Sequence, residues 1–291
     1  MKRKLNILFR ALNGCCLRIK AWFDIRLRKT ICRTEATYVP DLVVSLTSYG
    51  VRVKRCAPYA VYSVLKQDVR PYKVILWLDE TKWSMNNVPK LMKKLIRSGL
   101  EIRFCHDVKS YTKLLPALKA YPDKVIVTVD DDLYYSRNFL TTLYEAYQTD
   151  KKSIHALKVQ YPTYGPDGIL EPHRKWMLSY MIRDNFPYDA RKIMALGYGG
   201  GLYPPGAFDE EVFNEKVFMR LCPYADDIWF FAMALKKGTL RKYVLGKNVS
   251  YYAVDFFYQY FHTSALHDIN IAQDRNSSQM TDVLRYYGLT V

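Results

Sequence analysis

The amino-acid sequence predicts an α/β fold, built on a mostly parallel sheet with helices on both faces. Over about the first 130 residues, short apolar segments rich in β-branched residues alternate with segments whose apolar residues have helical spacing. Alternating strands and helices are typical of parallel sheets, because the crossover helices cover both faces. A length of 291 residues suits one large domain or two modest ones.

Four strands are expected in this region: DLVVSLT (41–47), KVILWLD (73–79), EIRFC (101–105) and KVIVTVD (124–130). Helices are expected between them at 56–67, 88–99 and 113–122, the last begun or interrupted by Pro116, and residues 35–40 are interpreted as a linker. Ligands of such sheets bind beyond the carboxyl ends of the strands. Two of these strands end in acidic residues, WLDE (77–80) and VDDD (129–132).

Charge and cysteine content narrow the class of protein. Of the net charge of +16, residues 1–34 contribute +9, from ten basic side chains and the single acid Asp24, and the remaining 257 residues contribute +7. A nucleic-acid binder would usually carry its basic surplus in the folded domain, so no specific nucleic-acid partner is expected. The six cysteines show no zinc-binding spacing, and scattered thiols favour a reducing, cytoplasmic setting.

The N-terminal arm, residues 1–34, has the pattern of a basic amphipathic helix. Arg10, Arg18 and Lys20 interrupt its apolar residues, so no run approaches the roughly 20 residues that span a bilayer. Two interpretations remain: peripheral contact with the inner face of an anionic membrane, or packing onto the rest of the protein. At helical spacing one face carries Leu5, Leu8, Phe9, Leu12, Cys16, Ile19 and Phe23.

The strongest chemical signal is KVIVTVDDDLYYS, in which three carboxylates leave a buried strand. Like charges this close need a cation or strong hydrogen bonds to offset their repulsion. Alternate residues of an extended segment share a face, so Asp130 and Asp132 could converge on one Mn²⁺ or Mg²⁺ together with substrate phosphates. The alternative is a solvated strand end whose last Asp caps the next helix.

A second acidic pair opens the predicted helix in PYADDIWFFAMALKKG (223–238). One of Asp226 and Asp227 could be a general base, although helix capping and the helix dipole alone could also explain two carboxylates at this position. The glycine-rich LGYGGGLYPPGAF (196–208) is neither a Walker loop nor a dinucleotide fingerprint. It is either a tight ligand-lining loop or a plain turn.

Two weaker clusters complete the candidates. TSYGVR (47–52), after the first strand, offers hydroxyls, an aromatic face and Arg52, which suit a base and a phosphate. FHTSALHDIN (261–270) supplies His262 and His267, which are either structural or a further metal ligand.

Together these segments resemble the GT-A glycosyltransferases, in particular the bacterial capsule and lipopolysaccharide sugar transferases. The resemblance covers roughly residues 41–290 and rests on the order of the motifs as well as their content. In the closing LHDINIAQDRNSSQ, this chain has RNSSQ where an acidic residue is expected after the Asn. The matching segments are VVSLTSYGVR for the nucleotide-contacting strand and loop, YSVLKQDVRPYKVILWLDE for the next helix and strand, VTVDDDLYY for the D-x-D metal motif, GYGGGLYPPGAF for the acceptor loop and ADDIWF for the catalytic base.

The resemblance implies a role for each matching residue. Asp130 and Asp132 would bind Mn²⁺ or Mg²⁺, with His262 or His267 completing the metal shell, and Asp131 would lie near the ribose or the sugar. Asp227 would be the base, with Asp226 as its substitute. The donor pocket would include Thr47, Tyr49, Arg52, Asp79 and Lys113, and the acceptor loop Gly199, Gly200, Gly201 and Tyr203.

The predicted function is therefore metal-assisted transfer of a sugar, with a UDP-sugar as the expected donor, to a glycan or lipid-linked acceptor in surface polysaccharide synthesis. Inversion at the anomeric carbon is expected from a carboxylate base. The predicted organisation is the basic arm 1–34 followed by a GT-A domain at 35–291, with a nucleotide-sugar half at about 41–135 and an acceptor half at about 136–291. The alternatives are a sugar-binding module without turnover and a nucleic-acid-binding protein.

Overall fold

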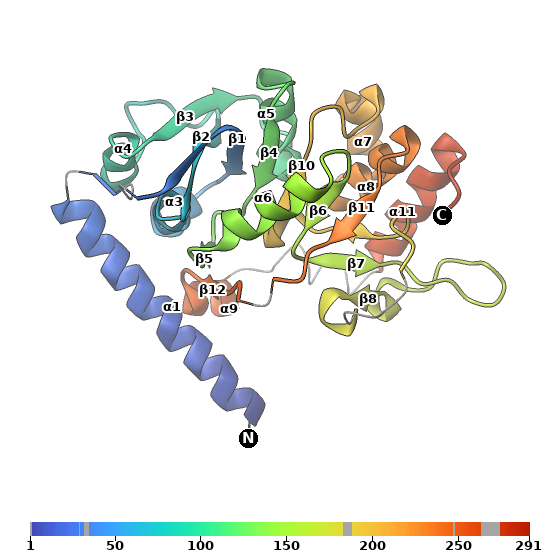
Figure 1. The fold of residues 1–291 in the computed structure, drawn as a ribbon, viewed down its shortest axis with the longest axis horizontal. Coiled ribbons are helices and arrows are strands. Elements are labelled where there is room, and N and C mark those ends of the chain that lie inside the picture. Colours follow the sequence, from blue (N-terminus) through green and yellow to red (C-terminus); the bar gives the residue numbers. More distant parts are fainter. Residues whose placement is uncertain (1, 29, 32–34, 183–187, 247, 263–273) are drawn as a thin grey trace.

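The computed structural model of the protein describes residues 2–28, 30–31, 35–182, 188–246, 248–262 and 274–291, with the backbone alone for residues 2–10 and 260–262. It confirms the predicted α/β class: a mostly parallel seven-stranded sheet carries helices on both faces (Figure 1). The strand order is β11-β6-β10-β4-β1-β2-β3. These strands are β1 (Thr37–Thr47), β2 (Val69–Asp79), β3 (Leu100–Cys105), β4 (Val125–Thr128), β6 (Ile154–Ala156), β10 (Gly201–Tyr203) and β11 (Arg241–Tyr243).

Helices and two small sheets surround the central sheet. The small sheets pair β5 (Leu133–Tyr135) with β12 (Tyr251–Ala253), and β7 (Val159–Tyr161) with β8 (Met177–Leu178) and β9 (Met194–Ala195). The helices are α1 (Lys2–Leu27), α2 (Arg52–Arg55), α3 (Ala57–Leu65), α4 (Lys90–Ile96), α5 (Leu115–Ala120), α6 (Phe139–Thr149), α7 (Glu215–Leu221), α8 (Asp226–Lys237), α9 (Phe256–His262) and α11 (Arg275–Tyr287). Short 3₁₀ helices are η1 (Lys109–Lys113), η2 (His173–Lys175), η3 (Ser179–Met181), η4 (Gly197–Gly199) and η5 (Glu210–Phe213).

All four predicted strands are present, with shifted ends. β1 begins at Thr37, so the interpretation of residues 35–40 as a linker was wrong: the backbone of Thr37–Val39 already pairs with the start of β2. β4 ends at Thr128, which leaves Asp130 in the loop beyond it. The predicted helix 113–122 is split into η1 and α5, and Pro116 lies in the first turn of α5, where it costs no hydrogen bond.

Alternation along the strands builds a core on each face of the sheet. In β1, Leu42, Val44 and Leu46 enter the core covered by α3, α4 and α6, whereas Val43 enters the core formed with α5, α7, α8 and α11. Successive side chains of a strand point to opposite faces, so a strand buried on both faces is apolar along its whole length. Helix α8 is buried on most sides because α11 also packs against it.

The sheet departs from a parallel arrangement at one strand. β10 is antiparallel to both β4 and β6, whereas β1 pairs in parallel with β2 and with β4. Gly200, directly before β10, has φ +92°, and a Cβ atom there would lie 2.5 Å from the Phe139 ring. The strand therefore enters the middle of the sheet through a residue that must be glycine.

We expect Gly200→Ala to lower the free energy of unfolding by about 2 kcal/mol or more, because it adds both backbone strain and overpacking. Gly206→Ala is the matched control: Gly206 has φ +68° but open space around its Cβ position, so about 1 kcal/mol of backbone strain is expected. Urea unfolding of both variants measures the difference. Equal losses would show that the Phe139 ring moves aside without cost.

Candidate active site

The three consecutive carboxylates lie in the loop between β4 and β5, beyond the carboxyl end of β4. Their side chains differ in exposure: Asp130 is 30% exposed and Asp132 21%, whereas Asp131 is only 4% exposed. The alternation predicted from the sequence is thus present. Asp130 and Asp132 are accessible from solvent, and Asp131 points into the protein.

Arg52 neutralises the inward carboxylate. It forms an ion pair with Asp131 and donates a hydrogen bond from Nε at 3.1 Å, while the Ser48 hydroxyl donates a second hydrogen bond to Asp131. The guanidinium also lies 2.8 Å from Asp132 Oδ2. Burial raises the pKa of Asp131 although Arg52 opposes it, and burial raises the pKa of Asp132 to about 7.

Lys113 connects the two acidic motifs. Its Nζ lies 3.5 Å from Asp130 Oδ1 and 3.2 Å from Asp226 Oδ2, and its side chain is 10% exposed. The Lys113 carbonyl accepts a hydrogen bond of 2.6 Å from the Ser45 hydroxyl of β1. The pKa of Lys113 is raised, because the nearby carboxylates outweigh the cost of burial. This cation therefore stays charged between two segments that are almost a hundred residues apart.

The second acidic pair lies in the first turn of α8, as predicted, but helix capping does not account for it. In the described chain no side chain caps this helix. Asp227 Oδ1 instead accepts a hydrogen bond of 2.9 Å from the Gly197 N–H of the glycine-rich segment. Asp226 is buried against Lys113, whereas Asp227 keeps partial exposure. Burial, reinforced by Asp226, raises the pKa of Asp227 to about 7.

Gly197 belongs to the predicted glycine-rich loop, but the sequence pattern assigned it no specific role in the site. A Cβ atom there would lie 2.9 Å from Lys113 Nζ and 3.3 Å from Asp227 Oδ1, so any side chain would disturb both groups. Thr128, the last residue of β4, donates a hydrogen bond of 3.3 Å from its hydroxyl to the Gly197 carbonyl. The glycine run was the available signal, but it did not single out this position.

Other residues around the aspartate loop were also missed. The Tyr135 hydroxyl accepts a hydrogen bond of 2.8 Å from the Asp130 N–H. The same hydroxyl donates a hydrogen bond to the Tyr198 carbonyl. Gln259 donates a hydrogen bond of 2.9 Å from its side-chain amide to the Asp132 carbonyl. Ser48 and Tyr135 stood inside predicted motifs, whereas nothing in the local sequence pointed to Gln259.

The remaining predicted donor residues lie near the carboxyl ends of β1 and β2. The Thr47 hydroxyl donates to the Trp77 carbonyl at 3.0 Å, and Tyr49 is exposed, with the Arg52 guanidinium 5.3 Å from its ring centroid. Asp79 accepts two hydrogen bonds from Thr81 and pairs with Lys82, which lowers its pKa to about 2. No contact joins Asp79 to the aspartate loop in the described residues, so its donor-binding role stays a prediction.

The predicted acceptor loop lies mostly inside the protein. Gly199, Gly200, Gly201 and Tyr203 are buried, and Gly201 and Tyr203 belong to β10 in the centre of the sheet. Tyr198 is the large side chain of η4 that remains exposed. The acceptor role of these four residues stays a prediction, and Tyr198 joins them as an accessible aromatic surface.

A divalent metal can be tested against this arrangement. In the part of the chain that the structure describes, no three His, Cys, Asp or Glu side chains gather in a ready-made metal site. His262 ends α9 with its side chain outside the description, and His267 lies outside the described residues. Mn²⁺ and Mg²⁺ are often held by one or two carboxylates plus substrate phosphates. The accessible oxygens of Asp130 and Asp132 fit that mode of binding.

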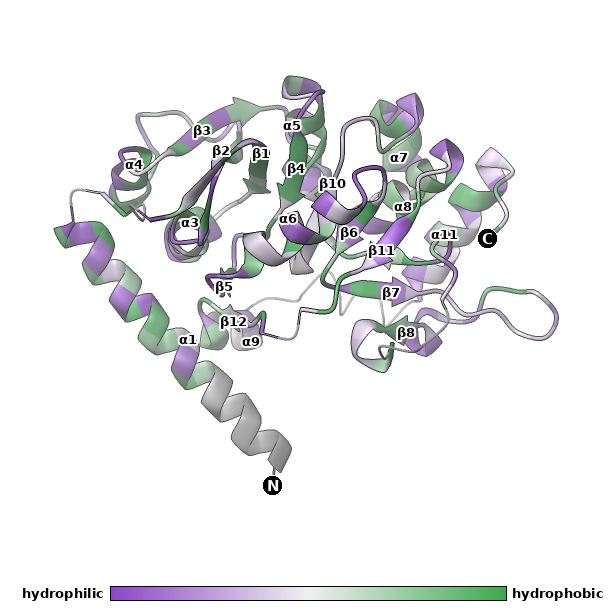
Figure 2. Ribbon diagram, in the orientation of Figure 1, coloured by the Kyte–Doolittle hydropathy of each residue, from purple (hydrophilic) through white to green (hydrophobic). Residues whose placement is uncertain are grey.

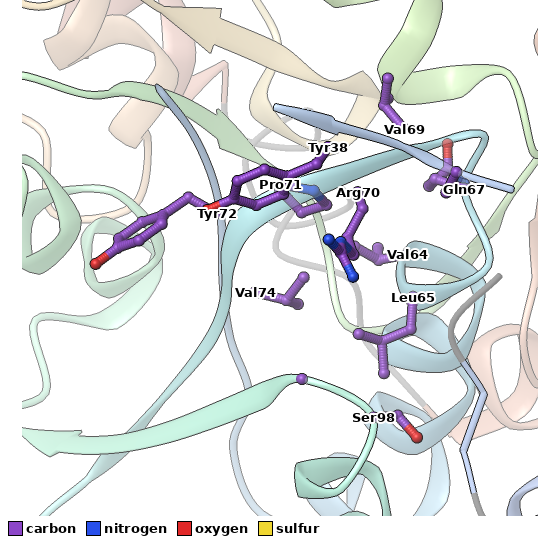
Figure 3. Close-up of a pocket in the computed structure, with 12 residues that line it drawn as sticks. Tyr38, Val64, Leu65, Gln67, Val69, Arg70, Pro71, Tyr72, Val74 and Ser98 are labelled. Carbon is purple, nitrogen blue, oxygen red and sulfur yellow. The ribbon is translucent and has the colours of Figure 1, made fainter. Parts of the chain in front are cut away.

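A cavity of about 350 Å³ lies elsewhere, at the opposite ends of the strands. It is lined by Tyr38 near the start of β1, by Leu65 and Ser98, and by five residues at the start of β2: Val69, Arg70, Pro71, Tyr72 and Val74 (Figure 3). Ligands of parallel sheets bind at the carboxyl ends, where the acidic motifs meet. This cavity is therefore separate from the candidate active site.

Neither a protein-family model nor a curated protein sequence matches the chain. The solved structure of the mannosyltransferase PcManGT from Pyrobaculum calidifontis, in complex with GDP-Man and Mn²⁺, is similar over 97% of this chain and 74% of its own, with 12% identity and a TM-score of 0.51. S. aureus TarS 1–349 is similar over 85% of this chain and 72% of its own, with 14% identity and a TM-score of 0.48. The likeness to PcManGT shows a shared fold. The chain has the GT-A fold.

We expect Arg52→Met to destabilise the protein by about 3 kcal/mol or more, because it leaves Asp131 buried without its cation. Arg52→Met/Asp131→Asn, which also removes the charge, should be less destabilised than Arg52→Met alone. Arg137→Met, which breaks an exposed pair with Asp68, serves as the control and should change the unfolding midpoint little. Additive losses in the double variant would contradict a coupled pair.

The raised pKa of Asp227 predicts a pH-dependent stability. Between the ordinary value of about 4 and about 7, the native state holds a proton that the unfolded chain releases, so stability falls as pH rises through this window. Relative to wild type, Asp227→Asn should therefore gain stability from about pH 4 to about pH 7, by an amount on the order of a few kcal/mol. Urea unfolding across this range measures the gain.

Asp150 supplies a control of opposite sign. Lys242, 2.6 Å away, lowers the pKa of Asp150, so its contribution is present at neutral pH and is lost as pH falls. Asp150→Asn should lose stability relative to wild type at neutral pH, and the loss should shrink in acid. A pH-independent difference for Asp227→Asn would rule out the raised pKa.

Proposed function

We propose that the chain is a glycosyltransferase that moves a sugar from a nucleotide-sugar donor to an acceptor hydroxyl. The observation that carries this proposal is the meeting of two acidic motifs around Lys113, whose Nζ lies 3.5 Å from Asp130 and 3.2 Å from Asp226. Both motifs adjoin the carboxyl ends of the strands. The resemblance to GT-A glycosyltransferases implies that the donor binds at this edge of the sheet. The alternative of a sugar-binding module without turnover does not require a base such as Asp227.

In this proposal, Asp130 and Asp132 hold Mn²⁺ or Mg²⁺ together with the donor diphosphate. The metal supplies positive charge that stabilises the departing nucleoside diphosphate. Two observations support this: both carboxylates are partly exposed to solvent, and burial, together with the neighbouring carboxylates of Asp130 and Asp131, raises the pKa of Asp132 to about 7 although Arg52 lowers it. The complex of PcManGT with GDP-Man and Mn²⁺ supports the same class of donor and metal.

Asp227 is the proposed general base. During transfer the bond between the anomeric carbon and the diphosphate oxygen breaks, the acceptor oxygen bonds to that carbon, and the acceptor proton passes to Asp227. A pKa near 7 suits proton transfer at neutral pH. The Gly197 N–H donates a hydrogen bond to one oxygen of Asp227, whereas Asp226 forms an ion pair with Lys113. This difference favours Asp227 over Asp226 as the base. Because the acceptor oxygen attacks the anomeric carbon in one step as the base takes its proton, the proposal implies inversion at that carbon.

The acceptor in this proposal is a glycan or a lipid-linked sugar, in keeping with the capsule and lipopolysaccharide transferases that the sequence resembles. The donor nucleotide expected from that resemblance is UDP, and the proposed location of the protein is the cytoplasm. Tyr49 and Tyr198 are exposed aromatic side chains beside the two motifs, and such rings suit nucleotide bases and sugars.

Titration calorimetry with UDP and with GDP, each with and without Mn²⁺, tests the donor site. We expect wild type to bind one nucleotide in a metal-dependent manner, and Asp130→Ala/Asp132→Ala to bind it at least about tenfold more weakly, because two metal ligands are lost. Asp123→Ala/Glu210→Ala removes the same charge from exposed positions and should bind as wild type does.

Asp227→Asn separates donor binding, measured by the same calorimetry, from catalysis, measured by a parallel assay of sugar transfer. It should keep metal-dependent nucleotide binding but lose transfer by about a hundredfold or more, the usual effect of removing a general base. If folded wild-type protein bound neither nucleotide with Mn²⁺ present, the metal-dependent proposal would be wrong.

A further inference from the structure

Helix α1 presents an apolar stripe to solvent. Leu12, Ile19, Phe23 and Leu27 are 57%, 58%, 50% and 78% exposed, and Cys16 is exposed between them. At 3.6 residues per turn these five positions lie on one side of the helix. Figure 1 shows α1 along one flank of the protein, with its N-terminal end extending away from the body. We call these five residues the apolar stripe.

The opposite side of α1 is packed against the rest of the protein. Ala11, Gly14, Ala21 and Ile25 are buried there, and a Cβ atom at Gly14 would lie 2.3 Å from the Ala253 carbonyl oxygen of β12. The two interpretations of the N-terminal arm are therefore not exclusive. One face of the helix is fixed to the protein, and the other, with the apolar stripe, has no covering in the described chain.

Positive charge surrounds the apolar stripe. Lys20 and Arg26 are exposed, and helical spacing puts one on each side of the stripe. Asp24, the only acid of residues 1–34, accepts a hydrogen bond from the Tyr62 hydroxyl and pairs with Arg28 at 2.8 Å. Residues 1–34 carry a net charge of +9, and their single carboxylate is paired within the protein. Figure 2 shows hydrophobic and hydrophilic residues interleaved along the coloured part of this helix.

We propose that the apolar stripe seats this protein on a bilayer surface that contains anionic lipids. An apolar face bordered by Lys and Arg is the form that binds such interfaces, through burial of apolar side chains and attraction to the headgroups. No helix in the described ranges is both long and apolar enough to cross a bilayer, so contact would be at the surface. The surplus of positive charge favours lipid over a second copy of the same basic helix, which would be repelled.

The seating would bring the candidate active site near the membrane. Arg18 of α1 forms an ion pair with Asp255, which also pairs with Arg55 at 2.6 Å. The neighbouring Val254 N–H donates a hydrogen bond of 2.8 Å to the Asp132 carbonyl. Few links therefore separate α1 from the aspartate loop. This part of the inference rests on the proposed function, and it favours a lipid-linked acceptor over a soluble one.

Sedimentation of the full chain with vesicles tests the seating without reference to activity. Vesicles of phosphatidylcholine with phosphatidylglycerol should retain wild type, and phosphatidylcholine alone should retain far less. Leu12→Gln/Ile19→Gln/Phe23→Gln should reduce partitioning to the anionic vesicles at least tenfold, since Gln keeps helix propensity and removes apolar surface. The matched control is Met85→Gln/Ile169→Gln/Tyr180→Gln, three exposed apolar residues away from α1, which should partition as wild type does.

Lys20→Gln/Arg26→Gln separates the electrostatic part: it should weaken binding to anionic vesicles and leave the low binding to neutral vesicles unchanged. Undiminished binding of the triple stripe variant, with unfolding like that of wild type, would overturn the proposal. So would absence of vesicle binding by wild type together with a dimer that the triple variant dissociates, since the stripe would then pair with a second copy. If vesicle binding holds but no nucleotide binds, the seating stands and the transferase proposal fails.

Discussion

The buried ion pair between Arg52 and Asp131 is the constraint on which the candidate site depends. It joins the segment after β1 to the loop after β4, two neighbouring parallel strands. Because Asp131 is drawn inward by Arg52 and Ser48, the extended loop must direct Asp130 and Asp132 outward. A single interior contact thus decides which carboxylates a ligand can reach.

Charge in the site is unbalanced. Among the described residues, two cations, Arg52 and Lys113, contact the site's five carboxylates: Asp130, Asp131, Asp132, Asp226 and Asp227. Burial raises the pKa values of Asp132 and Asp227 to about 7, and the neighbouring carboxylates add to this effect because a proton relieves their repulsion. A divalent cation on the accessible carboxylates would relieve the same repulsion. The same property that costs stability in the free protein would favour metal binding.

Much of the fold could be read from periodicity, and less from short polar contacts. The strands β1 to β4 could be predicted as apolar runs between helical segments, and α8 as the helix that the second acidic pair opens. β6, β10 and β11 have three residues each, too few to show a period, and β10 begins with a glycine. Their membership of the central sheet is set by tertiary pairing, which no local pattern records.

The site shows the same division. The sequence located both acidic motifs and the glycine run because each is compact in sequence. The sequence could not show that Lys113 contacts both Asp130 and Asp226, because these contacts join distant segments. For the same reason it could not show that Asp255 pairs with both Arg18 and Arg55. Whether a predicted residue faces solvent or the interior, as for Asp131 and Tyr203, also depends on neighbours that the local sequence does not contain.

The late position of β10 in the chain has a consequence for synthesis on the ribosome. The strands β4-β1-β2-β3 can pair once residue 128 has emerged, but the outer side of β4 is completed only by Gly201–Tyr203. Until then the apolar VIVT strand has an open edge, which can recruit a strand from another nascent chain. The two halves of the chain share one sheet through this pairing, so a fragment ending near residue 135 would keep that edge open and depend on chaperones to remain unaggregated.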